Sequence, residues 1–417
     1  MIQLHEVFGV GRGVPRYTYV DRSGLDARFN YLLGTERHIV VHGASKQGKS
    51  CLRRKNLNEA NCIIVQCSPE MSNKNLWQNA LRQLNACMTS SESETKQIGG
   101  SIGGHIQSDL NAFIIKSEGK LESTISSNSE NNRVKSYVSG KEDDLDFLSA
   151  ELKKHKKRLV LEDFHYLSES FRRKVAFDLK ALYELGIYVI VIGIWSEQNL
   201  LTYYNGDLTG RIEEININWN GPELDEVLQK GEKTLNIEFS KELKKSLIES
   251  SFQNVGLLQR TAEKLCFTNG ILTTQKAKQI LIPDEMLQSA ITQVIADIGQ
   301  RYTRICEVFV KGFRSDTKLR IYYKIFRVLT KIDERYLING TPYDMLLKMV
   351  QEESTEEVRP SDLTQCLDRI ERLQATRQIT PLLVSYNKNL KLLALMDREF
   401  LFFRKHGSVD WEELVPE

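Results

Sequence analysis

One stretch constrains this chain more than any other: His38–Ser50, which reads HIVVHGASKQGKS. Three β-branched residues at its start predict a short buried strand. From Gly43 the spacing through Gly48, Lys49 and Ser50 is G-x-x-x-x-G-K-S, and a segment that reads as a helix follows. In such a strand–loop–helix unit, the loop N–H groups and the helix N-terminus converge on one anion-sized space. The sequence therefore predicts a loop that cradles phosphate groups.

This phosphate-binding loop, or P-loop, predicts how a nucleotide is held. Lys49 would reach the β- and γ-phosphates, and the Ser50 hydroxyl would ligate Mg²⁺. We expect ATP to bind along the whole loop, which consists of Gly43, Ala44, Ser45, Lys46, Gln47, Gly48, Lys49 and Ser50. A glycine turn between core elements is the alternative, but it leaves the Lys-Ser pair and the acidic strand described next unexplained.

A second apolar strand, LVLED, begins at Leu159 and ends in two adjacent carboxylates, as a Walker B strand does. One acid of such a pair binds the metal, directly or through water, and the other polarises the attacking water. By position, Glu162 takes the metal role together with Ser50, and Asp163 takes the base role. In a Walker B strand the more usual order of the two acids is Asp-Glu, so in this sequence the residue in the base position has the shorter side chain. We therefore expect firm ATP binding and slow hydrolysis.

Composition excludes several other classes of protein. The chain has 417 residues with 57 basic and 55 acidic side chains, so net charge argues neither for nor against nucleic-acid binding. Its seven cysteines form no C-x-x-C pair, which predicts neither disulfides nor a zinc site. The N-terminus does not read as a signal peptide, and the longest apolar run, Ile187–Trp195, is about half of a membrane span. We expect a soluble cytoplasmic protein without membrane contact.

Changes in composition and periodicity predict several domains. They are a lead-in over 1–37, an α/β P-loop core with a parallel sheet over 38–218, a helical lid over 219–282, a connecting helix over 283–315 and a winged-helix-like domain over 316–417. In the lead-in, the glycine-rich Phe8–Gly13 reads as flexible. A helix follows near residue 25, either lining an adenine pocket or packing on the core.

A polar insertion interrupts the core over 89–142. It contains twelve serines, six glycines and no proline. We expect a β-hairpin over Ile98–Ile115 followed by a mobile polar tract through Ser139. Two interpretations remain open: a disordered loop without a partner, and a surface arm that engages one.

The core resembles that of an AAA+ ATPase, closest to the STAND and replication-initiator branches, and stretches such as LEDFHYL and NGDLTGR carry this resemblance beside the P-loop. It implies a sensor 1 residue at Ser196 or Asn199, unless Ser196 only caps a helix. It also implies an arginine finger at Arg211 that acts on a neighbouring subunit, unless Arg211 pairs with a local carboxylate such as Asp207. In the lid, Arg260 is the candidate for sensor 2, with a plain solvent-facing residue as the alternative.

The C-terminal part reads as three helices and a hairpin, the pattern of a winged helix. The helices are expected over Lys318–Ile332, Pro342–Glu352 and Ser361–Ala375, and the strands over Ile379–Tyr386 and Leu390–Met396. If the third helix enters a DNA groove, it presents Thr364, Gln365, Arg369, Arg372 and Gln374. Residues 311–417 contain eighteen basic and seventeen acidic side chains, although residues 301–335 contain ten basic and four acidic ones. Docking to DNA and docking to protein both remain open.

The resemblance implies an ATP-binding and ATP-hydrolysing molecular switch that assembles with nucleotide as a homo-oligomer. In one hypothesis it controls a protein partner or effector, as in bacterial anti-phage defence. In the alternative it is an initiator- or transposition-type ATPase that loads on DNA through its winged helix. A third possibility is a nucleotide-binding scaffold that scarcely hydrolyses.

Overall fold

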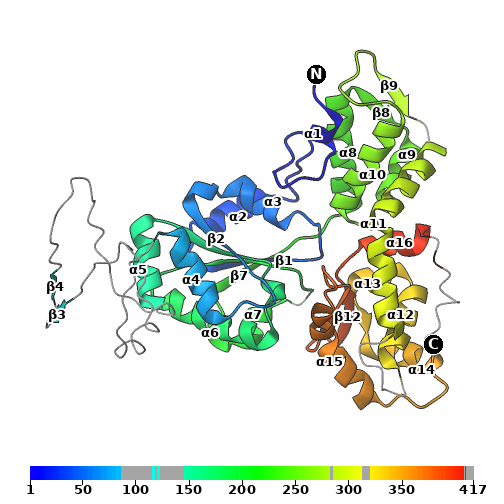
Figure 1. Ribbon diagram of the computed structural model, residues 1–417. Helices are drawn as coiled ribbons and strands as arrows, with labels where there is room; N and C mark the ends of the chain where they lie inside the picture. Colours follow the sequence, from blue (N-terminus) through cyan, green and yellow to red (C-terminus); the bar gives the residue numbers. More distant parts are fainter. Residues whose placement is uncertain are drawn as a thin grey trace, which may run out of the picture.

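The computed structural model describes residues 1–85, 115–117, 120–122, 145–196, 198–281, 285–311, 320–407 and 409. Its described part consists of a sheet-containing core, a helical lid that includes the N-terminus, and a C-terminal helical domain (Figure 1). Within these residues, no helix combines the length and the apolar character needed to cross a membrane.

The core is built on one parallel sheet of five strands in the order β2-β5-β6-β1-β7. Their bounds are β1 His38–His42, β2 Cys62–Gln66, β5 Arg158–Glu162, β6 Ile190–Ile192 and β7 Ile212–Asn216. All four neighbouring pairs run parallel, so the carboxyl ends of these strands meet at one edge. The predicted parallel α/β core is confirmed, and the P-loop lies at this edge.

Helices cover both faces of the sheet because its strands are buried on both sides. On one face lie α2 Leu25–Leu33 and α3 Lys49–Asn56; on the other lie α4 Asn73–Gln83, α5 Leu145–His155, α6 Glu169–Glu184 and α7 Leu200–Tyr204 (Figure 1). The strand β1 alternates accordingly: Ile39 and Val41 pack with Leu52 of α3, whereas Val40 packs with Leu81 of α4. The described part of the core also contains the short 3₁₀ helices η1 Glu59–Asn61, η2 Phe164–Tyr166 and η3 Gly206–Leu208.

The lid combines three helices with a two-stranded parallel sheet. These are α8 Gly221–Leu235, α9 Lys241–Ser250, α10 Val255–Thr268, β8 Ile237–Phe239 and β9 Gln279–Leu281. The N-terminal helix α1 Leu4–Val7 packs beside α8 (Figure 1). Phe8 is fully buried there, so close to α8 that a Cβ on Gly231 would lie 2.1 Å from its ring. The expectation that this lead-in is flexible is therefore wrong at Phe8, which anchors the N-terminus to the lid.

A long helix, α11 Glu285–Lys311, connects the lid to the C-terminal domain. That domain contains α12 Ile321–Lys331, α13 Glu334–Asn339, β10 Thr341–Pro342, α14 Tyr343–Glu352, α15 Pro360–Thr376, β11 Val384–Asn387, β12 Leu392–Leu395 and α16 Glu399–His406. The strands form an antiparallel sheet in the order β10-β12-β11. Apart from α13 and α16, these elements follow the order that the sequence predicts for a winged helix, and we keep that name for this predicted domain.

The hairpin strands are shorter than expected, and two helices, α13 and α16, were not expected at all. Strand β11 begins at Val384 rather than at Ile379. Pro381 lacks an N–H group, so this stretch cannot continue a ladder. Instead, the backbone N–H groups of Leu383 and Val384 donate to the Gln374 side chain. The terminal helix α16 follows β12 after three residues.

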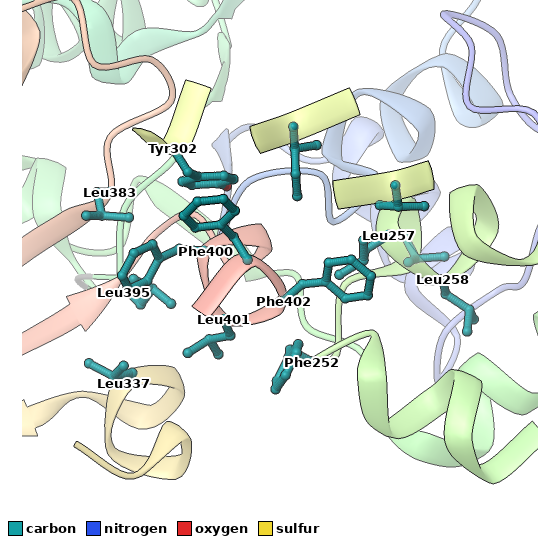
Figure 2. Packing of buried hydrophobic residues seen from close by; sticks show 14 of the residues in the cluster. Phe252, Leu257, Leu258, Tyr302, Leu337, Leu383, Leu395, Phe400, Leu401 and Phe402 are labelled. Atoms are coloured by element: carbon teal, nitrogen blue, oxygen red, sulfur yellow. The ribbon is translucent and has the colours of Figure 1, made fainter. Parts of the chain in front are cut away.

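Helix α16 is wedged between the lid and the winged helix (Figure 2). Phe402 points toward Leu257 and Leu258 of the lid, whereas Phe400 packs on Tyr302 of α11 with a ring-centroid distance of 6.0 Å. As a result, the lid, α11 and the winged helix share one continuous hydrophobic core, whereas two separate clusters cover the faces of the central sheet.

The polar insertion is described only at a short antiparallel pair, β3 Ile115–Ser117 and β4 Lys120–Glu122. The hairpin expected over Ile98–Ile115 and the polar tract through Ser139 otherwise lie outside the described residues.

Candidate nucleotide-binding site

The P-loop leaves β1 through a glycine that no other residue can replace without strain. Gly43 has φ +135°, and a Cβ there would lie 2.5 Å from the carbonyl oxygen of Ile217, which follows the neighbouring strand β7. At the other end, Gly48 has φ +82° and precedes the first residue of α3, which is Lys49. The two predicted glycines thus set the geometry that turns a strand into the start of a helix.

Lys49 lies across its own loop. Its Nζ atom donates to the carbonyl oxygens of Gly43 at 3.2 Å and Ala44 at 2.6 Å. The pKa of Lys49 is lowered to about 7, mainly because the group is buried; Asp163 acts to raise it, and the nearby cations Arg398 and Arg22 act to lower it. An anion bound beside this ammonium group would stabilise its charged form.

The carboxylate of Glu162, at the end of β5, has a partner that sequence reasoning missed. Its Oε1 atom accepts a hydrogen bond from Nε of Arg53 at 2.8 Å. Arg53 lies on α3, one turn after Lys49, and its side chain is fully buried. The available signal was the i, i+4 spacing of these two residues, which places both on one helix face.

Asp163 is the carboxylate whose charge acts on the pKa of Lys49. It has φ +56° directly after the strand, and it accepts a hydrogen bond from the Gln66 amide at the end of β2. Burial raises the pKa of Asp163, the charge of Glu162 adds to that, and Gln66 and Lys49 act against it. Of the two acids, Asp163 is therefore the one electrostatically coupled to the P-loop lysine.

This arrangement does not fit the metal site expected from the sequence, in which Ser50 and Glu162 hold Mg²⁺. The charge of the Glu162 carboxylate is already balanced by the buried Arg53 guanidinium, and only 8% of the Glu162 side chain is exposed. A hydrated divalent cation needs open oxygen ligands with uncompensated charge. The ion pair thus departs from the metal role predicted for Glu162.

The sensor 1 candidates follow β6, which lies next to β1. The Gly193 N–H donates to Val41 at 3.1 Å, so the segment leading to Ser196 runs along the carboxyl edge of the sheet. The Ser196 hydroxyl is buried without a hydrogen-bond partner among the described residues. Asn199 instead has its backbone N–H bonded to Glu214 at 2.8 Å. Because this bond involves only the backbone of Asn199, Ser196 and Asn199 both stay predictions for sensor 1. The Ser196 hydroxyl makes no helix cap among the described residues.

Arg211 lies at the opposite edge of the sheet. Its carbonyl oxygen accepts from the N–H of His38, the first residue of β1, whereas the P-loop follows the last. The guanidinium contacts Glu184 at 3.0 Å and the Asp207 carbonyl oxygen at 3.0 Å, and it lies over the Tyr183 ring. Arg211 thus lies away from the P-loop of its own chain.

Arg260 and Lys46 share one carboxylate, that of Glu399 in α16. Lys46 Nζ contacts its two oxygens at 2.7 and 2.8 Å, and Arg260 Nη1 lies 3.3 Å from Oε1. Arg301 of α11 also approaches Glu399, at 3.4 Å. The Glu399 side chain is fully buried by these partners. The alternative of a purely solvent-facing Arg260 is wrong.

The turn before α16 touches the P-loop directly. The backbone N–H of Ser45 donates to the carbonyl oxygen of Met396 at 2.9 Å. Arg398 donates to the Asn218 side chain after β7 and to the Gln253 carbonyl oxygen in the lid, both at 3.2 Å. Sequence reasoning did not connect Met396–Glu399 to this site. The available signal was a charged triplet directly after an apolar strand.

A cavity of about 160 Å³ opens beside the P-loop. Its walls are mostly apolar and come from the N-terminal segment, the lid and the loop itself; they include Val10, Pro15, Val20, Trp219, Val255, Gly48 and Cys51. Arg22 lies 4.6 Å from the Trp219 ring centroid, and both side chains donate to the Gln47 carbonyl oxygen. An apolar slot next to a phosphate loop suits a flat nucleobase.

Helix α15, which would enter a DNA groove if this domain binds DNA, presents only part of the side chains named for that role. Thr364, Gln365, Arg369 and Arg372 are exposed. Gln374 is fully buried and bonds to the backbone of Ile370, Leu383 and Val384, so its expected place on a DNA-reading face is wrong. Glu371 pairs with Arg172 of α6 at 3.2 Å, which brings α15 against the core.

No protein-family model and no curated protein matches the sequence. Solved structures do match its fold. The Walker-type ATPase PABY2304 of Pyrococcus abyssi aligns with a TM-score of 0.50 and 13% identity over 94% of this chain and 97% of that one. Orc1 of Aeropyrum pernix in complex with DNA aligns with a TM-score of 0.43 and 9% identity, over 96% of this chain and 94% of that one. Cdc6p of Pyrobaculum aerophilum aligns with a TM-score of 0.38 and 12% identity, over 99% of this chain and 98% of that one. Together with the five-stranded parallel sheet and its P-loop, the likeness to PABY2304 shows that this chain shares the fold of that Walker-type ATPase.

Proposed function

We propose that this chain is an ATP-binding switch in which the turn Met396–Glu399 competes with nucleotide phosphate for the P-loop. The observation that carries the proposal is the buried Glu399 carboxylate, which is bonded to Lys46 of the loop and to Arg260 of the lid. Both cations are expected phosphate ligands, and a carboxylate satisfies them in the way a phosphate oxygen would. The Ser45 N–H, another expected hydrogen-bond donor to phosphate, donates instead to the carbonyl oxygen of Met396.

Competition for shared donors couples the two events energetically. A bound polyphosphate attracts Lys46 and Arg260 more strongly than one carboxylate does, because it carries more charge. Loss of these contacts weakens the attachment of α16, which is wedged between the lid and the winged helix. The position of the winged helix would therefore depend on the nucleotide, and its docking would in turn lower nucleotide affinity.

Hydrolysis in this proposal is slow. In the proposal Asp163 orients the attacking water, and its electrostatic coupling to Lys49 supports that role. Arg211 contributes from a neighbouring subunit, because it lies at the opposite sheet edge of its own chain. Such a site implies a homo-oligomer. The further idea, control of a protein effector as in bacterial anti-phage defence, is supported only by the resemblance of the core sequence.

A DNA-loading role is the second candidate, and the exposed face of α15 favours it. Arg369 and Arg372 lie with Thr364 and Gln365 on the helix that enters the major groove in winged-helix complexes. If it holds, DNA affinity falls steeply with salt, because arginine–phosphate contacts release counterions. Binding that is weak and insensitive to salt would favour the protein-partner role.

The substitution Glu399→Gln tests the switch. It keeps the shape of the side chain but removes the charge that competes with phosphate, so we expect ATP to bind roughly 5- to 50-fold more tightly, measured by isothermal titration calorimetry. The control is Asp368→Asn, an acid of the winged helix that pairs with Lys388 on the surface; its ATP affinity should match the wild type.

Two results would overturn the proposal. Unchanged or weaker ATP binding by the Glu399→Gln variant would show that the turn does not compete with nucleotide. Normal ATP affinity in Lys49→Ala would show that Gly43–Ser50 is not the nucleotide site.

A further inference from the structure

The ion pair between Arg53 and Glu162 has consequences for the chemistry of the site. Arg53 is fully buried on α3, and its Nη1 and Nη2 atoms have no hydrogen-bond partner among the described residues. Its other nearby carboxylate, that of Glu59, lies 3.6 Å away and is largely exposed. Glu162 is therefore the one buried counterion of this guanidinium in the described part of the chain.

A metal ion could recruit Glu162 only by weakening this pair. The guanidinium cannot shed its proton, so losing Glu162 would leave a buried charge with only the exposed Glu59 carboxylate, 3.6 Å away, to compensate it. A divalent cation held close to Glu162 would add repulsion with the same guanidinium. The pair therefore favours an arrangement in which Arg53, and no metal, neutralises Glu162.

The protein itself supplies positive charge to the phosphate position. Lys46 and Lys49 belong to the loop, and Arg22 donates to the Gln47 carbonyl oxygen at 2.7 Å. Arg22 and Arg398 are close enough to Lys49 to lower its pKa. Four cations thus surround the loop, and a diphosphate or triphosphate can be neutralised by them without a metal ion.

We propose that this site binds adenine nucleotide without a divalent metal, because Arg53 is the resident counterion of Glu162. The inference rests on the proposed function, namely that Gly43–Ser50 holds nucleotide. It adds the form of the ligand: metal-free ADP and ATP bind as well as their magnesium complexes do.

The test is calorimetric titration of the full chain with ADP, once in Mg²⁺ and once in EDTA. We expect the two dissociation constants to agree within about threefold. In Arg53→Gln, Glu162 loses its counterion and becomes available to a metal, so ADP should bind at least tenfold more tightly in Mg²⁺ than in EDTA. The matched control is Arg54→Gln, which removes the neighbouring, partly exposed arginine and should behave like the wild type in both buffers.

The possible outcomes separate the two proposals. A wild-type dissociation constant that rises tenfold or more in EDTA overturns metal-free binding while leaving nucleotide binding intact. No ADP binding in either buffer overturns the proposed function, and this inference with it. If the Arg53→Gln variant does not fold, the comparison of ADP binding by the wild-type chain in Mg²⁺ and in EDTA still decides whether a metal is needed.

Discussion

Buried charges in oppositely charged pairs are a feature of this site. Arg53, Glu162 and Glu399 are each nearly or fully shut off from water, and each is matched by an opposite charge at 2.7 to 2.8 Å. Burying an unpaired ion is very costly, so a buried pair holds its two segments in one arrangement far more firmly than a surface pair does. The pair Lys46–Glu399 therefore specifies where α16 sits, and Arg53–Glu162 specifies the state of the acidic strand.

Gly43→Ala tests how tightly the loop is packed. The new Cβ would lie 2.5 Å from the Ile217 carbonyl oxygen, at a φ that alanine rarely adopts. We expect a loss of about 2–4 kcal/mol in the free energy of unfolding, measured by urea denaturation.

The control for Gly43→Ala is Gly299→Ala in the middle of α11, where a Cβ meets open space. Because alanine is the better helix former, this variant should gain about 0.5–1 kcal/mol. Equal effects of the two substitutions would contradict the loop geometry.

Helix α16 joins the lid, α11 and the winged helix through buried side chains. Its eight residues include five buried side chains, among them Phe400 and Phe402. One side of the helix meets the lid and the other meets α11 and the winged helix, so α16 closes the core that these parts share (Figure 2). Its first residue, Glu399, is also the one that reaches the P-loop.

Phe402→Ala should weaken this junction. The ring is fully buried against the lid, so its removal leaves a cavity and costs about 3–5 kcal/mol in unfolding free energy, seen as a lower midpoint in chemical denaturation. Phe177→Ala is the comparison, because that ring is 57% exposed on α6 and its loss should change stability by less than about 0.5 kcal/mol. A similar, small effect of both would mean that α16 is not part of the core.

The whole molecule brings distant segments of the chain to one edge of one sheet. The P-loop, the two acids, Ser196 and Asn218 follow or end the strands β1, β5, β6 and β7, respectively. Arg260 of the lid and Arg398 of the C-terminal domain contact residues at this same edge. Arg211, at the far edge, lies outside this assembly. A role for it in catalysis therefore requires a second copy of the chain.

Arg211→Ala tests that requirement. We expect wild-type protein to assemble in ATP, as measured by size-exclusion chromatography with light scattering, and the variant to lose this assembly while keeping its ATP affinity. Glu184→Gln is the control, because it removes the intramolecular partner of Arg211 but leaves the guanidinium. Nucleotide-linked assembly that persists in Arg211→Ala would contradict a finger supplied by a neighbour.

Local sequence was sufficient for much of the fold. The parallel sheet, the P-loop at its edge and the order of helices and strands in the winged helix all depend on spacing within short segments. The backbone conformation at Gly43 and Gly48 follows from local sterics, and the strands follow from the periodicity of their apolar residues. Both depend on residues that are close in the sequence. The same locality explains why Phe8 was misread: a glycine-rich stretch shows no sign of the distant helix that buries it.

Contacts between distant segments were not predictable in this way. Lys46 and Glu399 are 353 positions apart, and Arg53 and Glu162 are 109 apart. Whether a lysine or a glutamate is a nucleotide ligand, a metal ligand or half of an ion pair depends on which opposite charge the fold places within about 3 Å of it. The sequence alone determined that this chain carries a phosphate loop on a parallel sheet. The folded chain determined which charges surround that loop, because burial and pairing are properties of the packed whole.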